Sequence, residues 1–141
     1  MTETTRRDAL VAGSVAAIVS GAPSTLYALR RGRSLSEATA AAGSILLPNE
    51  TRTPVLVAAA VPVHIGVSLF WAAVFERSLP RQTTALWGGL AGAGVAALDL
   101  LVIGRRLPRI RALPLGPQFA DHILFGITVG AVLRARRSHR S

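Results

Sequence analysis

Residues 9–29 read ALVAGSVAAIVSGAPSTLYAL, 21 consecutive residues without an acidic, basic or histidine side chain. No polar stripe with a 3.6-residue period runs through this stretch, so a helix formed by it is apolar on every side. A helix needs about 20 mainly apolar residues to cross a hydrocarbon core of roughly 30 Å. The stretch therefore predicts a transmembrane helix and not one face of a water-soluble domain.

Three further stretches have the same character. Residues 53–75 contain one ionisable side chain, His64, and residues 82–98 contain none before the apolar run resumes after Asp99 and stops at Gly104. Residues 112–133 hold only Asp121 and His122. We therefore predict an all-α fold, in which residues 1–141 form a single integral membrane domain. The predicted fold is a four-helix transmembrane bundle with spans at about 8–29, 54–75, 84–104 and 117–133.

The charges lie outside these stretches. All 16 basic residues are Arg, against 7 acidic residues, which gives a net charge of +9. A basic nucleic-acid-binding domain displays its cations on one face of an amphipathic element, and that pattern is absent here. We therefore expect no nucleic acid as partner, but a lipid bilayer, with anionic head groups at Arg105, Arg106, Arg109 and Arg111. The plainer interpretation of these four residues is ordinary charge flanking a span.

Counting Arg does not fix the orientation. Loops on the cytoplasmic side usually carry the excess of positive charge, but here the two sides carry eight Arg each. One side has Arg6, Arg7, Arg77, Arg81, Arg134, Arg136, Arg137 and Arg140. The other has Arg30, Arg31, Arg33, Arg52, Arg105, Arg106, Arg109 and Arg111. Either one helix is misassigned, or another signal settles insertion, or both orientations insert as an antiparallel dimer. The Arg-rich tail favours a multi-pass protein of the cell membrane with both termini in the cytoplasm.

The N-terminus and the segment after the first span allow further predictions. Arg6-Arg7 before an apolar run is also typical of an export signal, but the run is long for one and no soluble domain follows it. The sequence SLSE at residues 34–37 matches a capping box, and an Ala-rich run follows until Pro48. The resulting helix of about 12 to 14 residues is too short to span, so we expect a short interfacial helix between spans 1 and 2.

Small residues and prolines shape the predicted spans. Pro23 and Pro62 lie inside spans, where they are expected to kink the helix and free a carbonyl. Small residues four apart allow helices to approach closely, so a homodimer through such faces is an expected partnership. The motifs are Gly13-x-x-x-Ala17-x-x-x-Gly21, Gly88-x-x-x-Gly92 and Gly126-x-x-x-Gly130.

Four ionisable residues lie inside the predicted spans: His64, Asp99, Asp121 and His122. At 1.5 Å per residue, Asp99 and Asp121 lie about 7 Å and 6 Å inside the same leaflet, and His64 about 15 Å inside from the same side. All four are therefore expected in the half of the bundle that faces residues 30–53 and 105–114.

Three interpretations of this polar cluster compete. In a structural network, Asp99 and Asp121 pair with Arg105 or Arg106, and His64 bonds a carbonyl freed near Pro62. In a proton or cation relay, Asp99 is the carrier and His64 titrates near neutral pH. A metal site is the third interpretation, but Asp121 and His122 point about 100° apart on a helix, so we predict no metal.

The sequence carries no sign of enzymatic chemistry. It lacks a nucleophile–base motif, a phosphate loop and a dinucleotide fingerprint, and without Cys it has no thiolate ligand or disulfide. We therefore expect no enzyme activity and no cofactor. The expected role is that of a structural or accessory membrane protein with a buried Asp/His network. The alternative is a small proton-coupled transporter that uses Asp99 and His64.

Several motifs carry a resemblance. GAPSTL at residues 21–26, GRRLPRIRALP at 104–114 and QFADH at 118–122, leading into Phe125-Gly126, resemble a family of small bacterial membrane proteins without assigned function. This resemblance implies a four-span bundle and no active residues. The chain also resembles small multidrug transporters in size and span count, but those rely on an acidic residue in the first span, which residues 9–29 lack.

Overall fold

The computed structural model describes residues 2–82 and 84–139, and this part of the chain contains helices and no strand. The first apolar stretch forms two helices, α1 (Glu3–Val19) and α2 (Ala22–Arg31), separated at Ser20 and Gly21. Pro23 stands in the first turn of α2, where its missing N–H is not needed. The interruption that Pro23 predicts is therefore present, whereas α4 (Thr53–Ser78) continues through Pro62.

The remaining elements follow in order along the chain. They are α3 (Glu37–Gly43), α4, α5 (Thr84–Ala96), a π-helical turn η1 (Ala97–Ile103), a 3-10 turn η2 (Gly104–Arg106), α6 (Pro108–Arg111) and α7 (Leu115–Ser138). The connection between η2 and α7 holds only the single turn α6, which begins at Pro108.

Three helical segments are long and apolar enough to cross a membrane: Glu3–Arg31, Thr53–Ser78 and Thr84–Arg106. They contain the first three predicted spans and extend each of them by a few residues. The predicted fourth span lies in α7, which is long enough at 24 residues but is not one of these three segments. The reason lies in its first turns, where Gln118, Asp121 and His122 lower the mean hydropathy.

Many large apolar side chains lie on the surface while small ones are buried, which is unlike a water-soluble protein. The large apolar residues Ile18, Leu86 and Val102 are 85%, 64% and 61% exposed, whereas Ala12 and Ala16 are completely buried. Surfaces of this kind are unfavourable in water, since each exposed apolar side chain forgoes roughly 1.5–3 kcal/mol of burial. Hydrocarbon solvates them without that cost, so the exterior fits a membrane-embedded protein.

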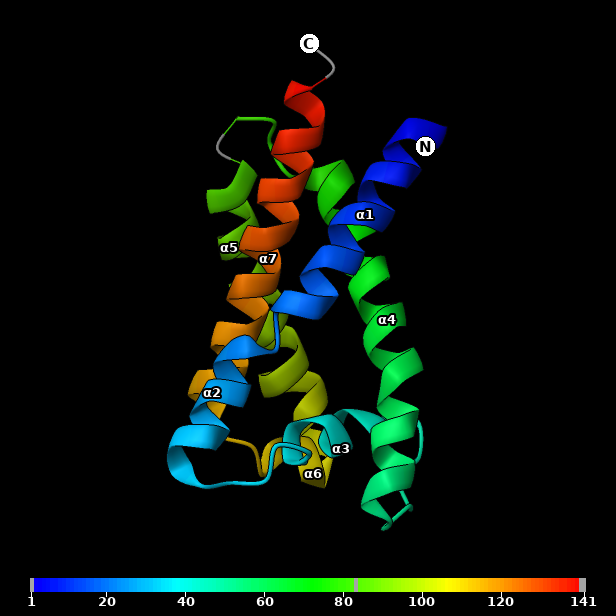
Figure 1. Ribbon diagram of the computed structural model, residues 1–141, viewed down its shortest axis with the longest axis vertical. Helices are drawn as coiled ribbons and strands as arrows, with labels where there is room; N and C mark the ends of the chain where they lie inside the picture. Colours follow the sequence, from blue (N-terminus) through cyan, green and yellow to red (C-terminus); the bar gives the residue numbers. More distant parts are fainter. Residues whose placement is uncertain (1, 83, 140–141) are drawn as a thin grey trace.

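The long helices run side by side between two ends of the molecule (Figure 1). The start of α1, the α4–α5 connection and the end of α7 lie together, and we call this the termini end. The connection between α2 and α4 and the turn α6 lie at the opposite end, the loop end. The elements in contact are α5 with α7, α1 with α4 and α7, α2 with α7, and α3 with α4. The two sides predicted from the Arg positions thus correspond to the two ends, with Arg140 outside the described residues.

Helices α5 and α7 touch through their backbones. A Cβ added at Gly88 would collide with the carbonyl oxygen of Gly126, and one added at Gly126 would collide with the carbonyl oxygen of Gly88. The contact repeats one turn away on both sides, because Gly92 lies against the carbonyl of His122 and Gly130 against that of Thr84. Two of the small-residue motifs therefore face each other within one chain.

The main apolar core lies beside this contact. Phe75 of α4 and Phe125 of α7 are almost fully buried, with ring centroids 6.1 Å apart. Around them pack Ala12, Ala16, Ala72, Val95, Val129 and Leu133. Gly13 brings α1 close to α4, since an added Cβ would lie 2.9 Å from the Cβ of Ala72. Small residues on α1 thus let one helix contact both α4 and α7.

The predicted capping box is wrong in its details. Helix α3 begins at Glu37 after Ser36, and no side chain caps it. The Glu37 carboxylate instead accepts two hydrogen bonds from the Arg33 guanidinium, at 2.6 and 3.0 Å. A charged donor competes better for a carboxylate than a backbone N–H does. The helix is also shorter than expected, at 7 residues, and it ends at Gly43. The backbone of α4 at Leu56 passes too close to Gly43 for any side chain there.

The glycine contact between α5 and α7 predicts the effect of a single methyl group. Gly126→Ala should separate the two helices and lower the thermal unfolding midpoint in detergent, at a cost of roughly 1–3 kcal/mol for overpacking. Gly94→Ala is the matched control, because a Cβ there meets nothing within 4 Å. Equal midpoints for the two variants would show that the close approach is not needed.

Candidate functional site

Asp99 lies in a widened turn of its helix. The N–H of Gly104 donates to the Asp99 carbonyl five residues earlier, which defines the π-helical turn η1. A Cβ at Gly104 would lie only 2.7 Å from that carbonyl oxygen, so the close approach favours Gly. Turns of this type are frequent at functional sites and seldom occur elsewhere in helices.

The Asp99 carboxylate meets a histidine of α7. Its Oδ2 lies 3.5 Å from Nε2 of His122, and Nδ1 of the same ring lies 2.8 Å from the carbonyl oxygen of Gln118. Because a carbonyl oxygen can only accept, Nδ1 carries the hydrogen. Nε2 and the carboxylate are then two proton acceptors that face each other, and one proton between them satisfies both. Both side chains are about a quarter exposed.

Asp121 caps the helix that follows the break in the first span. Its Oδ1 accepts a hydrogen bond of 2.9 Å from the backbone N–H of Ser24. This N–H belongs to the first turn of α2, where backbone donors have no partner within their own helix. The negative carboxylate also suits the positive end of the helix dipole. A residue of α7 thus completes the backbone hydrogen bonding of a discontinuous helix.

His64 makes the third polar contact between helices. Its Nε2 lies 2.8 Å from the carbonyl oxygen of Ala17, in the last turn of α1. The imidazole is exposed, as is most of α4 from residue 61 to 67. A Cβ at Gly66 would meet nothing within 4 Å. Apart from the contact of His64 with α1, residues 61–67 of α4 are therefore largely not covered by other helices.

The four residues make their hydrogen bonds across different helix pairs, but electrostatic interactions connect them. Asp99 and His122 meet, and Asp121 lies close enough to both His122 and His64 to interact with them electrostatically. Within the described residues no hydrogen bond or ion pair joins His64 to the other three. The predicted pairing of Asp99 and Asp121 with Arg105 or Arg106 is wrong. Those two Arg are exposed, while Asp99 meets His122 of α7 and Asp121 meets the backbone of Ser24 in α2. The expected carbonyl near Pro62 is likewise wrong, since His64 uses one freed at the end of α1.

Metal coordination has no support in the described residues. Nowhere among residues 2–82 and 84–139 do three His, Asp or Glu side chains converge as ligands. In the Asp99–His122 pair, the second ring nitrogen of His122 already faces the carbonyl oxygen of Gln118.

Two ion pairs at the termini end are absent from the sequence-based predictions. Arg136 of α7 donates to Asp8 of α1, whose residue is 2% exposed, and Arg137 donates to Glu76 of α4 at 3.2 Å. They tie the end of α7 to both neighbouring helices. Asp8 directly precedes the uncharged stretch and Glu76 directly follows one. The sequence signal for these ion pairs is an acidic residue at a span end on the same side as the Arg-rich tail.

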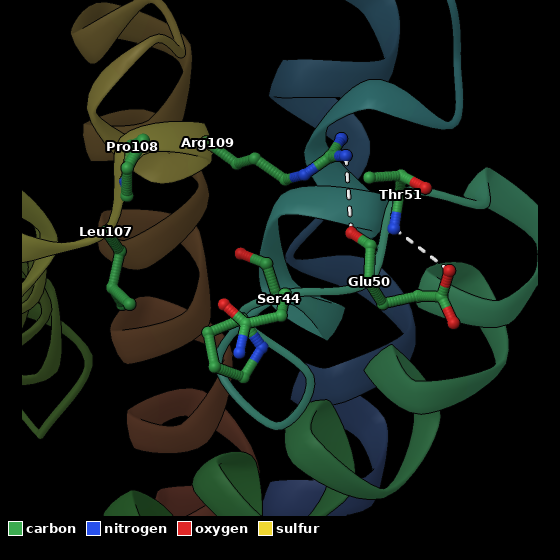
Figure 2. A pocket seen from close by; sticks show the side chains of 8 residues that line it. Ser44, Glu50, Thr51, Leu107, Pro108 and Arg109 are labelled. Atoms are coloured by element: carbon green, nitrogen blue, oxygen red, sulfur yellow. Dashed lines mark hydrogen bonds between the residues drawn. The ribbon is translucent and has the colours of Figure 1, made fainter.

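At the loop end, the four Arg predicted to meet lipid head groups are all exposed. Arg109 extends from α6 toward the segment before α4, where its Nη2 lies 3.5 Å from the carbonyl oxygen of Glu50 (Figure 2). The Glu50 carboxylate is bonded by Arg52, at 2.8 and 3.1 Å, and by two backbone N–H groups. These donors, the Arg52 side chain first, lower the pKa of Glu50 to about 2.

Comparison with protein-family models, with curated proteins and with solved structures finds no match to this chain. The resemblance to small bacterial membrane proteins stays a prediction, and the role of the chain has to be inferred from its own residues.

The hydrogen bonds to Glu50 predict an acid-resistant carboxylate. In an NMR titration of the detergent-solubilised protein, Glu50 should titrate near pH 2, and Arg52→Gln should move its pKa back toward 4.5. Because the folded-state pKa is lowered, the stabilisation is complete above the ordinary pKa and is lost as the pH falls from there to about 2. Arg81→Gln is the control. A Glu50 pKa near 4.5 in the unaltered protein would contradict the assignment.

Proposed function

We propose that the chain is a four-span protein of the cell membrane, with α7 as the fourth span and α3 lying in the interface at the loop end. At 1.5 Å per residue α7 is about 36 Å long, enough to cross the hydrocarbon core. Its last turns carry Arg134, Arg136 and Arg137, a position that suits head groups. Helix α3 is too short to cross and packs against the first turns of α4.

Within this membrane bundle we assign the Asp/His residues a structural or accessory role. The observation that carries it is the hydrogen bond from the Ser24 N–H to Asp121, which caps a helix that begins inside the first span. Water is scarce at that depth, so an uncapped N–H would cost several kcal/mol. Two further contacts give polar groups a partner between helices. His64 of α4 contacts the carbonyl oxygen of Ala17 in α1, and Asp99 of η1 contacts His122 of α7.

The remaining proposals concern orientation and self-association. The basic tail favours both termini in the cytoplasm. Four of the small residues predicted to associate helices are already used between α5 and α7, whereas Gly21 has no atom within 4 Å of an added Cβ. A homodimer through small residues would therefore form beside the break between α1 and α2.

The capping role predicts a graded loss of stability. Asp121→Leu should lower the unfolding free energy in detergent by about 1–3 kcal/mol, because the Ser24 N–H loses its acceptor. Asp121→Asn keeps an acceptor oxygen and should lose less. Thermal unfolding followed by circular dichroism measures both. A Leu variant as stable as the unaltered protein would remove the basis of the structural role.

A second candidate function is a small proton-coupled transporter, favoured by the facing acceptors on Asp99 and His122. One proton can rest on either group, since the second ring nitrogen of His122 is held by Gln118. His64, exposed on α4, is the second residue of the proposed relay. The π-helical turn gives Asp99 a place where a helix can change its hydrogen bonding.

Proteoliposomes test the transporter. A pH gradient should drive proton flux, measured with an internal pH dye, and Asp99→Asn or His64→Ala should reduce the flux at least about tenfold, because carriers are rarely replaceable. Glu3→Gln, at the exposed start of α1, should leave it unchanged. Absence of flux in the unaltered protein, or equal flux in all variants, excludes this function and leaves the structural role in place.

A further inference from the structure

Two hollows at the loop end share one guanidinium group. The first, of about 180 Å³, is lined by Ser44, Asn49 and Thr51 together with Arg109 (Figure 2). The second, of about 320 Å³, is also lined by Arg109, together with Ser34, Ser36 and Thr53. Each hollow is lined by one acidic residue as well, Glu50 in the first and Glu37 in the second. We propose that this place binds the phosphate of an anionic phospholipid, with Arg109 as the central cation.

The charge at the loop end suits such a ligand. The segments 30–53 and 105–114 contain eight Arg and two Glu. Both carboxylates are already paired, Glu37 with Arg33 and Glu50 with Arg52. Arg109 bonds only a backbone carbonyl in the described structure, at 3.5 Å, which is long for a hydrogen bond. Its guanidinium is free to make the two-pronged contact with phosphate oxygens that Arg favours.

The groups around Arg109 complete a phosphate site. A phosphate diester offers acceptor oxygens only, and the hydroxyls of Ser34, Ser36 and Thr53 can donate to them. The Ser34 and Ser36 hydroxyls are hydrogen-bonded to each other at 2.9 Å, which leaves one of their two protons to donate to an anion. Arg111 is exposed on the same turn, α6, and Arg105 is exposed on the preceding turn, η2, so both add to the local positive potential.

Exposed apolar side chains in the segments that contribute to the hollows favour a lipid over a free anion. Leu35 and Leu46 are 55% and 57% exposed, and they lie in residues 34–53, which supply most of the lining residues. Leu115, which begins α7 three residues after the lining residue Ala112, is 49% exposed. Leucines next to an anion site would be unfavourable in water, but they can contact the acyl chains of a lipid whose head group is held by Arg109.

This inference rests on the proposed membrane bundle, and the experiment separates the two. Purified protein in a neutral detergent is titrated with phosphatidylglycerol, phosphatidylcholine or inorganic phosphate, and bound molecules are counted by native mass spectrometry. Insertion into vesicles of phosphatidylcholine alone is measured in parallel by flotation. Failure to insert would overturn the bundle itself, whereas insertion without preference for phosphatidylglycerol overturns only the lipid site.

Three variants distinguish a specific lipid site at Arg109 from general electrostatic attraction between the basic protein and anionic lipid. Arg109→Gln should weaken phosphatidylglycerol binding about fivefold or more, the effect expected for one Arg at a head group. Arg81→Gln, at an exposed Arg of the termini end, should change it less than twofold. Thr53→Val, which leaves every charge in place, should weaken it about threefold through the lost hydroxyl. Equal weakening by Arg109→Gln and Arg81→Gln, or binding of inorganic phosphate as tight as that of the lipid, would overturn the proposal.

Discussion

The backbone contact between α5 and α7 is the constraint that brings Asp99 and His122 together. Gly88 and Gly126 bring the two helices together until each glycine lies against the carbonyl oxygen of the other. At this separation His122 of α7 reaches Asp99 in η1, the turn that follows α5. A wider spacing would break this contact, while other residues of α7, Asp121 and Phe125, contact α2 and α4.

The interior of a membrane protein leaves polar groups dependent on one another, because lipid offers no hydrogen bonds. Here the polar groups are distributed over three helix pairs, and two ion pairs close the termini end. The loop end differs, since its acidic groups are paired locally and its Arg side chains remain exposed. Arg side chains are exposed at both ends, but among the described residues only the termini end uses two of them, Arg136 and Arg137, to join helices through acidic side chains.

Much of the helical arrangement follows from the sequence, because uncharged runs such as residues 9–29 have only one way to satisfy their backbone in lipid. The glycine spacing on α5 and α7 likewise predicts a close approach. The partners of the polar residues could not be predicted, since they depend on helix rotation. Asp99 was expected to meet Arg105 or Arg106, but a π-helical turn directs it to His122. The burial of Asp8 could not be predicted, because Asp8 lies one residue outside the uncharged stretch. Its burial depends on the position of Arg136 in the folded chain, which the sequence does not give.

The π-helical turn at Ala97–Ile103 also bears on how such a chain could evolve. A turn closed by a bond five residues back holds one residue more than an α-helical turn, and each residue rotates the chain by about 100°. Loss of one residue in this turn would leave a regular helix of sufficient length. It would, however, rotate all side chains on one side of the deletion to a different face of the helix. Descendants with a shortened turn would keep their membrane helices and lose the Asp99–His122 contact in a single step.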